Sequence, residues 1–203
     1  GSRAANPACT AGRPLPKCWL PPSFTSRDVS GRHEPVLLRE TLGFLLQGSG
    51  LYLDATLGDA GHAEALLDAE RTARLLGCDR DSAALDRSRE RLRRFGDRVS
   101  IAHATFRELP EAHLRSGGEP FTGGLLDLGL SSRQIDDPSR GMSFMAEGPL
   151  DLRMDASRGE PVSERLLRVD ERELAAVLSE HGELRDTLRL ASTIVRAGRA
   201  GEL

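Results

Sequence analysis

The sequence has few aromatic residues, few cysteines and no long apolar run. Aromatic side chains make up only 4% of the 203 residues, so a core has to be built from Leu, Ala, Val and Ile. No apolar stretch approaches the roughly 20 residues that span a bilayer, so we expect no membrane segment. The 3 cysteines are an odd number without metal-ligand spacing, which argues against a disulfide framework and a zinc site. We therefore expect a soluble protein of the reducing cytoplasm that binds no metal.

The sequence also lacks an excess of positive charge. It carries 28 Lys and Arg against 31 Asp and Glu, a net charge of −3. Dedicated nucleic-acid modules are usually basic overall. Any RNA contact therefore has to come from a local patch or a shaped pocket. The densest basic stretch, residues 80–98, is interleaved with acids at helical spacing, which favours a solvated helix face over an RNA-binding surface.

Residues 1–32 differ in composition from the rest of the chain. They hold five of the 11 prolines and show no periodic apolar pattern, so we expect a disordered leader there. Their Arg and Ser content weakly resembles an organelle transit peptide, but the prolines oppose the amphipathic helix that such a peptide needs. An unstructured extension is the simpler interpretation.

Short apolar strands alternate with helical segments from residue 33 to residue 136. The patterns predict strands and intervening helices over residues 51–55, 62–70, 74–78, 81–95, 99–103 and 124–128. Such alternation is typical of parallel βαβ units, so we predict an α/β fold with a Rossmann-like sheet over residues 33–136. A polar stretch and two helices without a later strand follow, so residues 137–203 are predicted to form a helical domain.

Local signals bound the first of these two helices. Asp170 and Glu173 form a capping-box pattern at its start. Gly182 is a candidate for the left-handed residue just beyond its end. The apolar spacing from Leu184 to Val195 predicts the second helix.

The turn after the first predicted strand is rich in glycine, as ligand-binding turns often are. Asp79, at the end of the second strand, lies 21 positions after Gly58, and an acid there suits the two hydroxyls of an adenosine ribose. NAD and S-adenosylmethionine both carry that ribose. The turn is not GxGxxG, and Asp59 would repel a pyrophosphate at the following helix. The cationic sulfonium and amino groups of S-adenosylmethionine would instead suit Asp54 and Asp59. A nucleotide-cofactor oxidoreductase and an ordinary βα turn are the alternatives.

Three segments of the chain resemble a single known family. They read HEPVLL at residues 33–38, DATLGDAGH at 54–62 and GLLDLGLSSRQIDDPSRGMSFMAEGPLDLRMD at 124–155. In this order they closely resemble the RsmH (MraW) family, which uses S-adenosylmethionine to methylate N4 of a cytidine in bacterial small-subunit (16S) ribosomal RNA. The resemblance spans about residues 33–203. It implies a Rossmann-like methyltransferase sheet with a helical insertion domain.

The resemblance also implies a set of cofactor-binding residues. The positions that match the family's motifs are Ala60, Gly61, His62, Asp79, Phe106, Asp127 and Gln134. Asp127 is also the candidate catalytic residue, because amino-methyltransferases present an acceptor for the amine at the end of strand four; cofactor binding alone is the other role open to it. His62 is either a general base or a structural hydrogen-bonding group. Asp59 and Ala60 stand where the family usually has two glycines.

Two further expectations concern the later part of the chain. The run from Gly141 to Asp155, with Phe144 and all 3 methionines, is either a lid that clamps a flipped base or a packed loop between domains. The family pattern continues well beyond residue 203, so we expect an incomplete sheet whose exposed edge pairs with other chains, giving a homodimer or aggregates. A fragment that binds the cofactor without turnover is therefore an alternative to an active enzyme.

Overall fold

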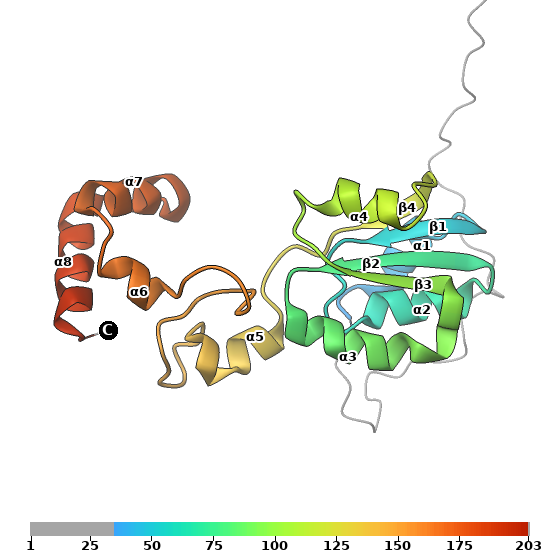
Figure 1. Ribbon diagram of the computed structural model, residues 1–203, viewed down its shortest axis with the longest axis horizontal. Coiled ribbons are helices and arrows are strands. Elements are labelled where there is room, and N and C mark those ends of the chain that lie inside the picture. The colour runs from blue at the N-terminus through green and yellow to red at the C-terminus, as the bar shows by residue number, and fades with distance from the viewer. Residues whose placement is uncertain (1–34, 203) are drawn as a thin grey trace, which may run out of the picture.

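The computed structural model describes residues 35–202, so the leader expected over residues 1–32 lies outside the described residues. It shows two lobes (Figure 1). We call residues 38–125 the sheet lobe and residues 162–200 the helical lobe; the connecting segment, residues 126–161, joins them. Within the part of the chain that the structure describes, no helix combines the length and apolarity needed to cross a membrane.

The sheet lobe is built on a parallel sheet with the strand order β3-β2-β1-β4. Its strands are β1 (Gly50–Asp54), β2 (Ala73–Asp79), β3 (Val99–His103) and β4 (Phe121–Leu125). This sheet and its helices confirm the predicted Rossmann-like α/β class. The fourth strand was predicted over residues 124–128 but begins and ends three residues earlier. The central strand β1 ends at Asp54, which pairs with Leu125, so the chain beyond Leu125 has no strand left to pair with.

Helices cover both faces of this sheet (Figure 1). Tyr52 and Leu75 point into a core cluster beneath three helices, whereas Leu51 and Leu76 point to the opposite face, because successive strand residues alternate in direction. The helices of the first face are α1 (Leu38–Leu45), α2 (Gly61–Ala69) and α3 (Ser82–Leu92), and that of the second is α4 (Leu109–Arg115). The sequence patterns did not predict α4, which has only 7 residues and a proline in its first turn.

The third helix is shorter than predicted. It ends at Leu92 rather than near Phe95, and the chain continues as a 3-10 segment, η2 (Arg93–Arg98). Gly96 takes a φ of 56° there, a left-handed conformation that breaks the helix. Phe95 still packs against the core beneath α3.

The connecting segment is irregular apart from α5 (Ser132–Asp136) and η3 (Pro138–Arg140), as its Gly, Pro and Asp content predicted. The helical lobe follows with α6 (Val162–Leu166), α7 (Glu171–Gly182) and α8 (Thr187–Ala200). Its core cluster has three buried members, Leu166, Val169 and Val195.

Both predicted signals at the ends of α7 need correction. Asp170 caps the helix by accepting from the backbone N–H of Arg172 at 2.8 Å, but Glu173 pairs with Arg165 and completes no capping box. Gly182 is the last helical residue, and Glu183 instead takes the left-handed φ of 51°.

Candidate cofactor-binding site

Hydrogen bonds from backbone N–H groups to side-chain oxygens join the loops at the carboxyl edge of the sheet. The N–H of Gly58, after β1, donates to Oδ2 of Asp79 at 2.7 Å, which joins the β1 and β2 loops. The N–H of Asp127, after β4, donates to Oγ1 of Thr56 at 2.7 Å, which joins the β4 and β1 loops. Ligands of open α/β sheets bind outside this edge. The candidate site is therefore a preformed rim of loops.

Asp79 has capacity left for a ligand. Its Oδ1 accepts from the N–H of Asp81 at 2.8 Å, and its Oδ2 accepts from Gly58. A carboxylate offers about four lone-pair positions, so about two remain for further donors. The residue is partly exposed. Its chemistry therefore fits the two hydroxyls of a ribose.

The start of α2 is held from outside by the segment that precedes α1. A Cβ on Gly61 would lie 2.3 Å from Cγ of Pro35, so only glycine leaves room for the proline ring. Nε2 of His62 lies 3.0 Å from the carbonyl oxygen of Val36. This contact supports the structural role of His62. Ala60 takes a left-handed φ of 60°, and its fully buried methyl group belongs to the core cluster under the sheet.

Asp54 is a buried carboxyl group at the same edge. It is 4% exposed, and burial raises its pKa from 3.8 to about 7; the N–H of Thr56 opposes this shift, and the charges of Asp79 and Asp127 add to it. Asp127 itself is exposed. Because a carboxyl group with this pKa is only partly ionised at neutral pH, the negative field of the edge comes mainly from Asp79 and Asp127, and it favours a cationic ligand over a phosphate.

The predicted role of Asp59 was wrong. Its Oδ1 lies 2.7 Å from Nε of Arg87, and its Oδ2 lies 2.5 Å from Nε of Arg133. Burial disfavours its charge, but the two guanidinium groups outweigh burial and lower its pKa. The carboxylate is therefore neutralised, so the argument that it repels a pyrophosphate no longer holds.

Gln134 joins α5 to the loop after β2. Its Oε1 accepts from the N–H of Ser131 at 2.9 Å while Oγ of Ser131 accepts from the N–H of Gln134 at 3.2 Å, which completes a capping box. Nε2 of Gln134 donates to Oδ2 of the buried Asp81 at 3.0 Å. The structure therefore uses this side chain to position α5. Phe106 follows β3 and is 52% exposed, so its ring is accessible to a ligand.

The side chains of most arginines of residues 80–98 form ion pairs or hydrogen bonds, some at the exposed surface and some partly buried. Nε of Arg91 lies 2.6 Å from Oε2 of Glu64 on α2. Arg98 donates to three backbone carbonyl groups around the end of α2, at 2.8–2.9 Å. The prediction of a solvated face holds for Arg89 and Arg93, whose side chains are 50% and 79% exposed, but not for Arg91, which links α3 to α2.

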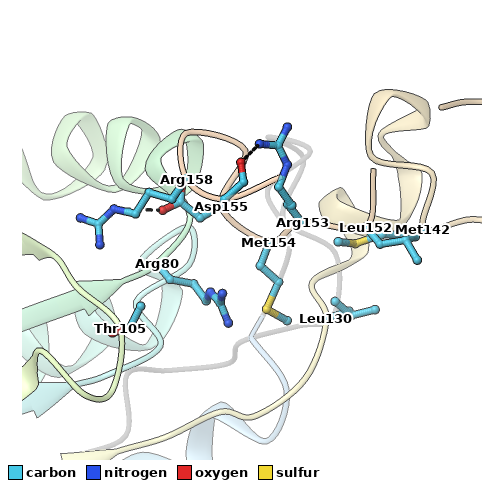
Figure 2. Close-up of a pocket in the computed structure, with 10 residues that line it drawn as sticks. Arg80, Thr105, Leu130, Met142, Leu152, Arg153, Met154, Asp155 and Arg158 are labelled. Atoms are coloured by element: carbon cyan, nitrogen blue, oxygen red, sulfur yellow. Dashed lines mark hydrogen bonds and ion pairs between the residues drawn. The ribbon is translucent and has the colours of Figure 1, made fainter. Parts of the chain in front are cut away.

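A cavity of about 750 Å³ adjoins the carboxyl edge (Figure 2). Arg80 and Thr105 line it from the loops after β2 and β3, next to Asp79 and Phe106. The connecting segment supplies the rest of the lining, from Leu130 to Gly159. The sequence patterns did not reveal this cavity, since its wall combines three distant segments.

Comparison with known proteins places these features in one family. The family model described as the MraW methylase family matches residues 30–202. The "Ribosomal RNA small subunit methyltransferase H" of Sorangium cellulosum is 48% identical over 186 residues, covering 91% of this chain and 58% of that protein. The protein of the same name from Salinispora tropica is 45% identical over 177 residues, covering 83% of this chain and 48% of the relative. The chain thus spans about half the length of the curated relatives that it matches.

A solved structure described as an rRNA methylase from Streptococcus thermophilus is also similar in part. It superposes with a TM-score of 0.36 and 20% identity, covering 44% of this chain and 51% of that one. The fold class rests on the parallel sheet itself and on the family match.

Proposed function

Because the chain belongs to the MraW methylase family, we propose that it supplies the cofactor-binding part of an S-adenosylmethionine-dependent methyltransferase acting on N4 of a cytidine in small-subunit (16S) ribosomal RNA. One observation carries the proposal. The residues that match the family's cofactor motifs come from four separate loops, and hydrogen bonds, including that from the N–H of Ala104 to the carbonyl oxygen of Asp79, join those loops at one edge of the sheet. The cofactor supplies an electrophilic methyl group on a cationic sulfonium, which suits the negative field of that edge.

The chemistry of each side chain suggests its role. The free lone pairs of Asp79 would accept from the ribose hydroxyls, and the accessible ring of Phe106 would pack on the adenine. Gly61 would act indirectly, because the ring of Pro35 fills the space beside its Cα and so positions the start of α2. Gln134 would hold α5 over the site through Asp81.

Asp127 is the proposed catalytic residue. The N4 amino group of cytosine is a poor nucleophile, because its lone pair is delocalised into the ring. Transfer therefore depends on orientation, on an acceptor for the amino protons and on the exclusion of water. Asp127 is exposed at the carboxyl edge and its backbone is anchored on Thr56, so its carboxylate is accessible to the amine from a fixed backbone position. The carbonyl groups of residues 128–130 would assist it.

Calorimetric titration tests the cofactor assignment. We expect the 203-residue chain to bind S-adenosylhomocysteine and not NADH, and Asp79→Asn to weaken binding about tenfold, the loss of a hydrogen bond to a charged group. Asp127→Asn should weaken this affinity less than Asp79→Asn does. Binding of NADH, or no selectivity between the two ligands, would contradict the proposal.

Methyl transfer tests the reaction. Small-subunit RNA is incubated with the chain and S-adenosylmethionine, and its nucleosides are analysed by mass spectrometry for N4-methylcytidine. We expect Asp127→Asn to abolish product while cofactor binding persists. Loss of binding in that variant would assign Asp127 to the cofactor alone. Cofactor binding without product in the unaltered chain would support the alternative of a fragment that binds without turnover.

The division of the chain and its self-association are also proposals. We propose that residues 33–136 are the cofactor-binding core and residues 137–203 a helical insertion domain, and that the protein acts in the cytoplasm. In the described sheet β4 is an edge strand, and Phe44 beside it is 85% exposed. Such an edge favours a homodimer. A single monomeric mass in light scattering would rule the dimer out.

A further inference from the structure

The cavity beside the cofactor edge has two chemically different sides. Arg80 reaches into it from the loop after β2, toward the side chain of Met154 (Figure 2). The apolar side comes from the connecting segment and consists of Leu130, Met142, Leu152 and Met154. A cavity that joins a guanidinium group to an apolar wall fits a ligand with an anionic group and a flat apolar group.

Arg80 is the arginine of this cavity whose charge is uncompensated. Arg153 pairs with Asp151 at 2.7 Å, and Arg158 pairs with Glu108 at 3.0 Å. The guanidinium group of Arg80 forms no hydrogen bond or ion pair with any residue of 35–202. Its backbone, by contrast, is held, because the carbonyl oxygen of Arg80 lies 2.9 Å from Nε2 of His103. The positive charge of Arg80 therefore extends into the cavity from a backbone whose position is fixed.

The unpaired positive charge of Arg80 distinguishes between the two ligands of the proposed reaction, S-adenosylmethionine and RNA. S-adenosylmethionine has no phosphate, and its sulfonium and ammonium groups outweigh its single carboxylate, so its net charge is positive and a guanidinium group attracts it less than it attracts RNA. None of the seven proposed cofactor residues lines the cavity. RNA carries one phosphate per nucleotide, and arginine binds phosphates with its planar fork of donors. The charge of the cavity thus favours the RNA over the cofactor.

The apolar wall favours an unpaired nucleotide. Proteins recognise RNA sequence mainly in single strands, whose unstacked bases pack on flat or apolar side chains. Beyond Met142, the same segment carries Phe144 and Met145, which are 106% and 93% exposed. Exposed side chains of this kind are available to further bases along a strand.

We propose that this cavity binds a nucleotide of the single-stranded RNA substrate, with Arg80 on its phosphate and the wall of Met142, Leu152 and Met154 against its base. The inference rests on the proposed function and adds a substrate-binding residue to it. It interprets the run from Gly141 to Asp155 as one wall of the RNA site.

The test compares two matched arginine variants. Arg80→Gln removes the proposed phosphate contact, and Arg71→Gln removes an exposed arginine from the turn before β2, at the opposite edge of the sheet. The probe is a fluorescein-labelled single-stranded RNA of 12 nucleotides (roughly the span of one binding groove) that contains cytidines. Its affinity is measured by anisotropy at several salt concentrations, and S-adenosylhomocysteine affinity is measured by calorimetry.

We expect Arg80→Gln to weaken RNA binding roughly tenfold, as the loss of one charged hydrogen-bonding contact would. The slope of log affinity against log salt should become shallower by about 0.7, the value for one phosphate contact on a single strand. Met154→Ala should weaken binding without changing this slope. Arg71→Gln should change neither quantity, and all three variants should bind S-adenosylhomocysteine as the unaltered chain does.

Three outcomes would overturn the inference. Equal RNA affinity in Arg80→Gln and Arg71→Gln would remove the role of Arg80. A loss of S-adenosylhomocysteine binding in Arg80→Gln would assign the cavity to the cofactor. A chain that binds S-adenosylhomocysteine but not the RNA would have no such site. Failure of the proposed function is distinct from all three, since the unaltered chain would then bind no S-adenosylhomocysteine.

Discussion

The sheet lobe and the helical lobe bury their apolar residues to very different extents. The sheet lobe has two core clusters, with ten and five buried residues, whereas the cluster of the helical lobe has three. A parallel sheet covered by helices has two protected faces, and three short helices have only the seam between them. Val177 and Leu188 accordingly remain 46% and 55% exposed. Burial of apolar side chains in the sheet lobe therefore contributes most of the free energy of unfolding of the described chain.

Polar contacts, rather than apolar ones, attach the connecting segment to the sheet lobe. Nη2 of Arg140 lies 2.9 Å from Oδ2 of Asp81, and both side chains are nearly buried. Nε2 of His103 lies 3.0 Å from Oδ2 of Asp155, which is 5% exposed. Buried ion pairs require defined geometry, so these two junctions determine where the wall of the cavity lies.

The largest expected effect comes from replacing one buried leucine by alanine in each of the two cores. Leu66→Ala in the sheet lobe should lower the free energy of unfolding by about 4 kcal/mol, since Leu66 is 1% exposed, and should abolish cofactor binding. Leu166→Ala should cost about 2 kcal/mol and leave S-adenosylhomocysteine affinity intact, because its cluster is small. Urea unfolding and calorimetry measure both. Equal effects on binding would show that the lobes unfold as one unit.

Removal of the ion pair between Arg140 and Asp81 should free the connecting segment from the sheet lobe without unfolding either core. Arg140→Met leaves the buried Asp81 without its cation, which costs about 3 kcal/mol. We expect faster hydrogen exchange and proteolysis in residues 141–161, with β1 and β2 still protected. Arg196→Met, at an exposed position on α8, is the control. Unchanged exchange in the connecting segment would remove Arg140 as the determinant of its position.

The pH dependence of stability should differ between the lobes. The pKa of Asp54 is raised in the folded state, so its protonated form stabilises the fold at low pH, and this contribution is lost as the pH rises through about 7. Between pH 5 and pH 8 the loss should be about 2 kcal/mol. Asp54→Asn should remove this loss from the sheet lobe and leave the helical lobe unaffected. Urea unfolding of both proteins across this pH range, followed separately for each lobe, provides the measurement. Parallel pH curves for variant and unaltered chain would contradict it.

The smallest expected effect lies in the loop at the start of α2. Ala60 has a left-handed φ of 60°, which costs a residue with a Cβ about 1 kcal/mol. Ala60→Gly should therefore raise the free energy of unfolding slightly, whereas the helical control Ala63→Gly should lower it by about 1 kcal/mol. Cofactor affinity should not change, because the methyl group of Ala60 points into the core. A large gain in affinity would instead mean that this methyl group narrows the site.

The strands β2 and β3 were predictable because the apolar run of each coincides with the residues that pair in the sheet. The start of β4 was not, because its extent depends on the length of β1. Helices with long apolar faces, such as α8, were also predictable. The short helices α4 and α6 were not, since their local signals are weak and packing stabilises them.

Asp79 and Gln134 were identified through motif positions, but their hydrogen-bond partners were not. Residue order along the chain was sufficient for the α/β class and the family resemblance, because both depend on local periodicity and on the spacing of loop residues. The pairing of Asp59 with Arg87 and Arg133, the burial of Asp54 and the unpaired charge of Arg80 depend on segments far apart in the chain. Charge and burial are set by all neighbours of a side chain, so these properties arise only when the chain folds.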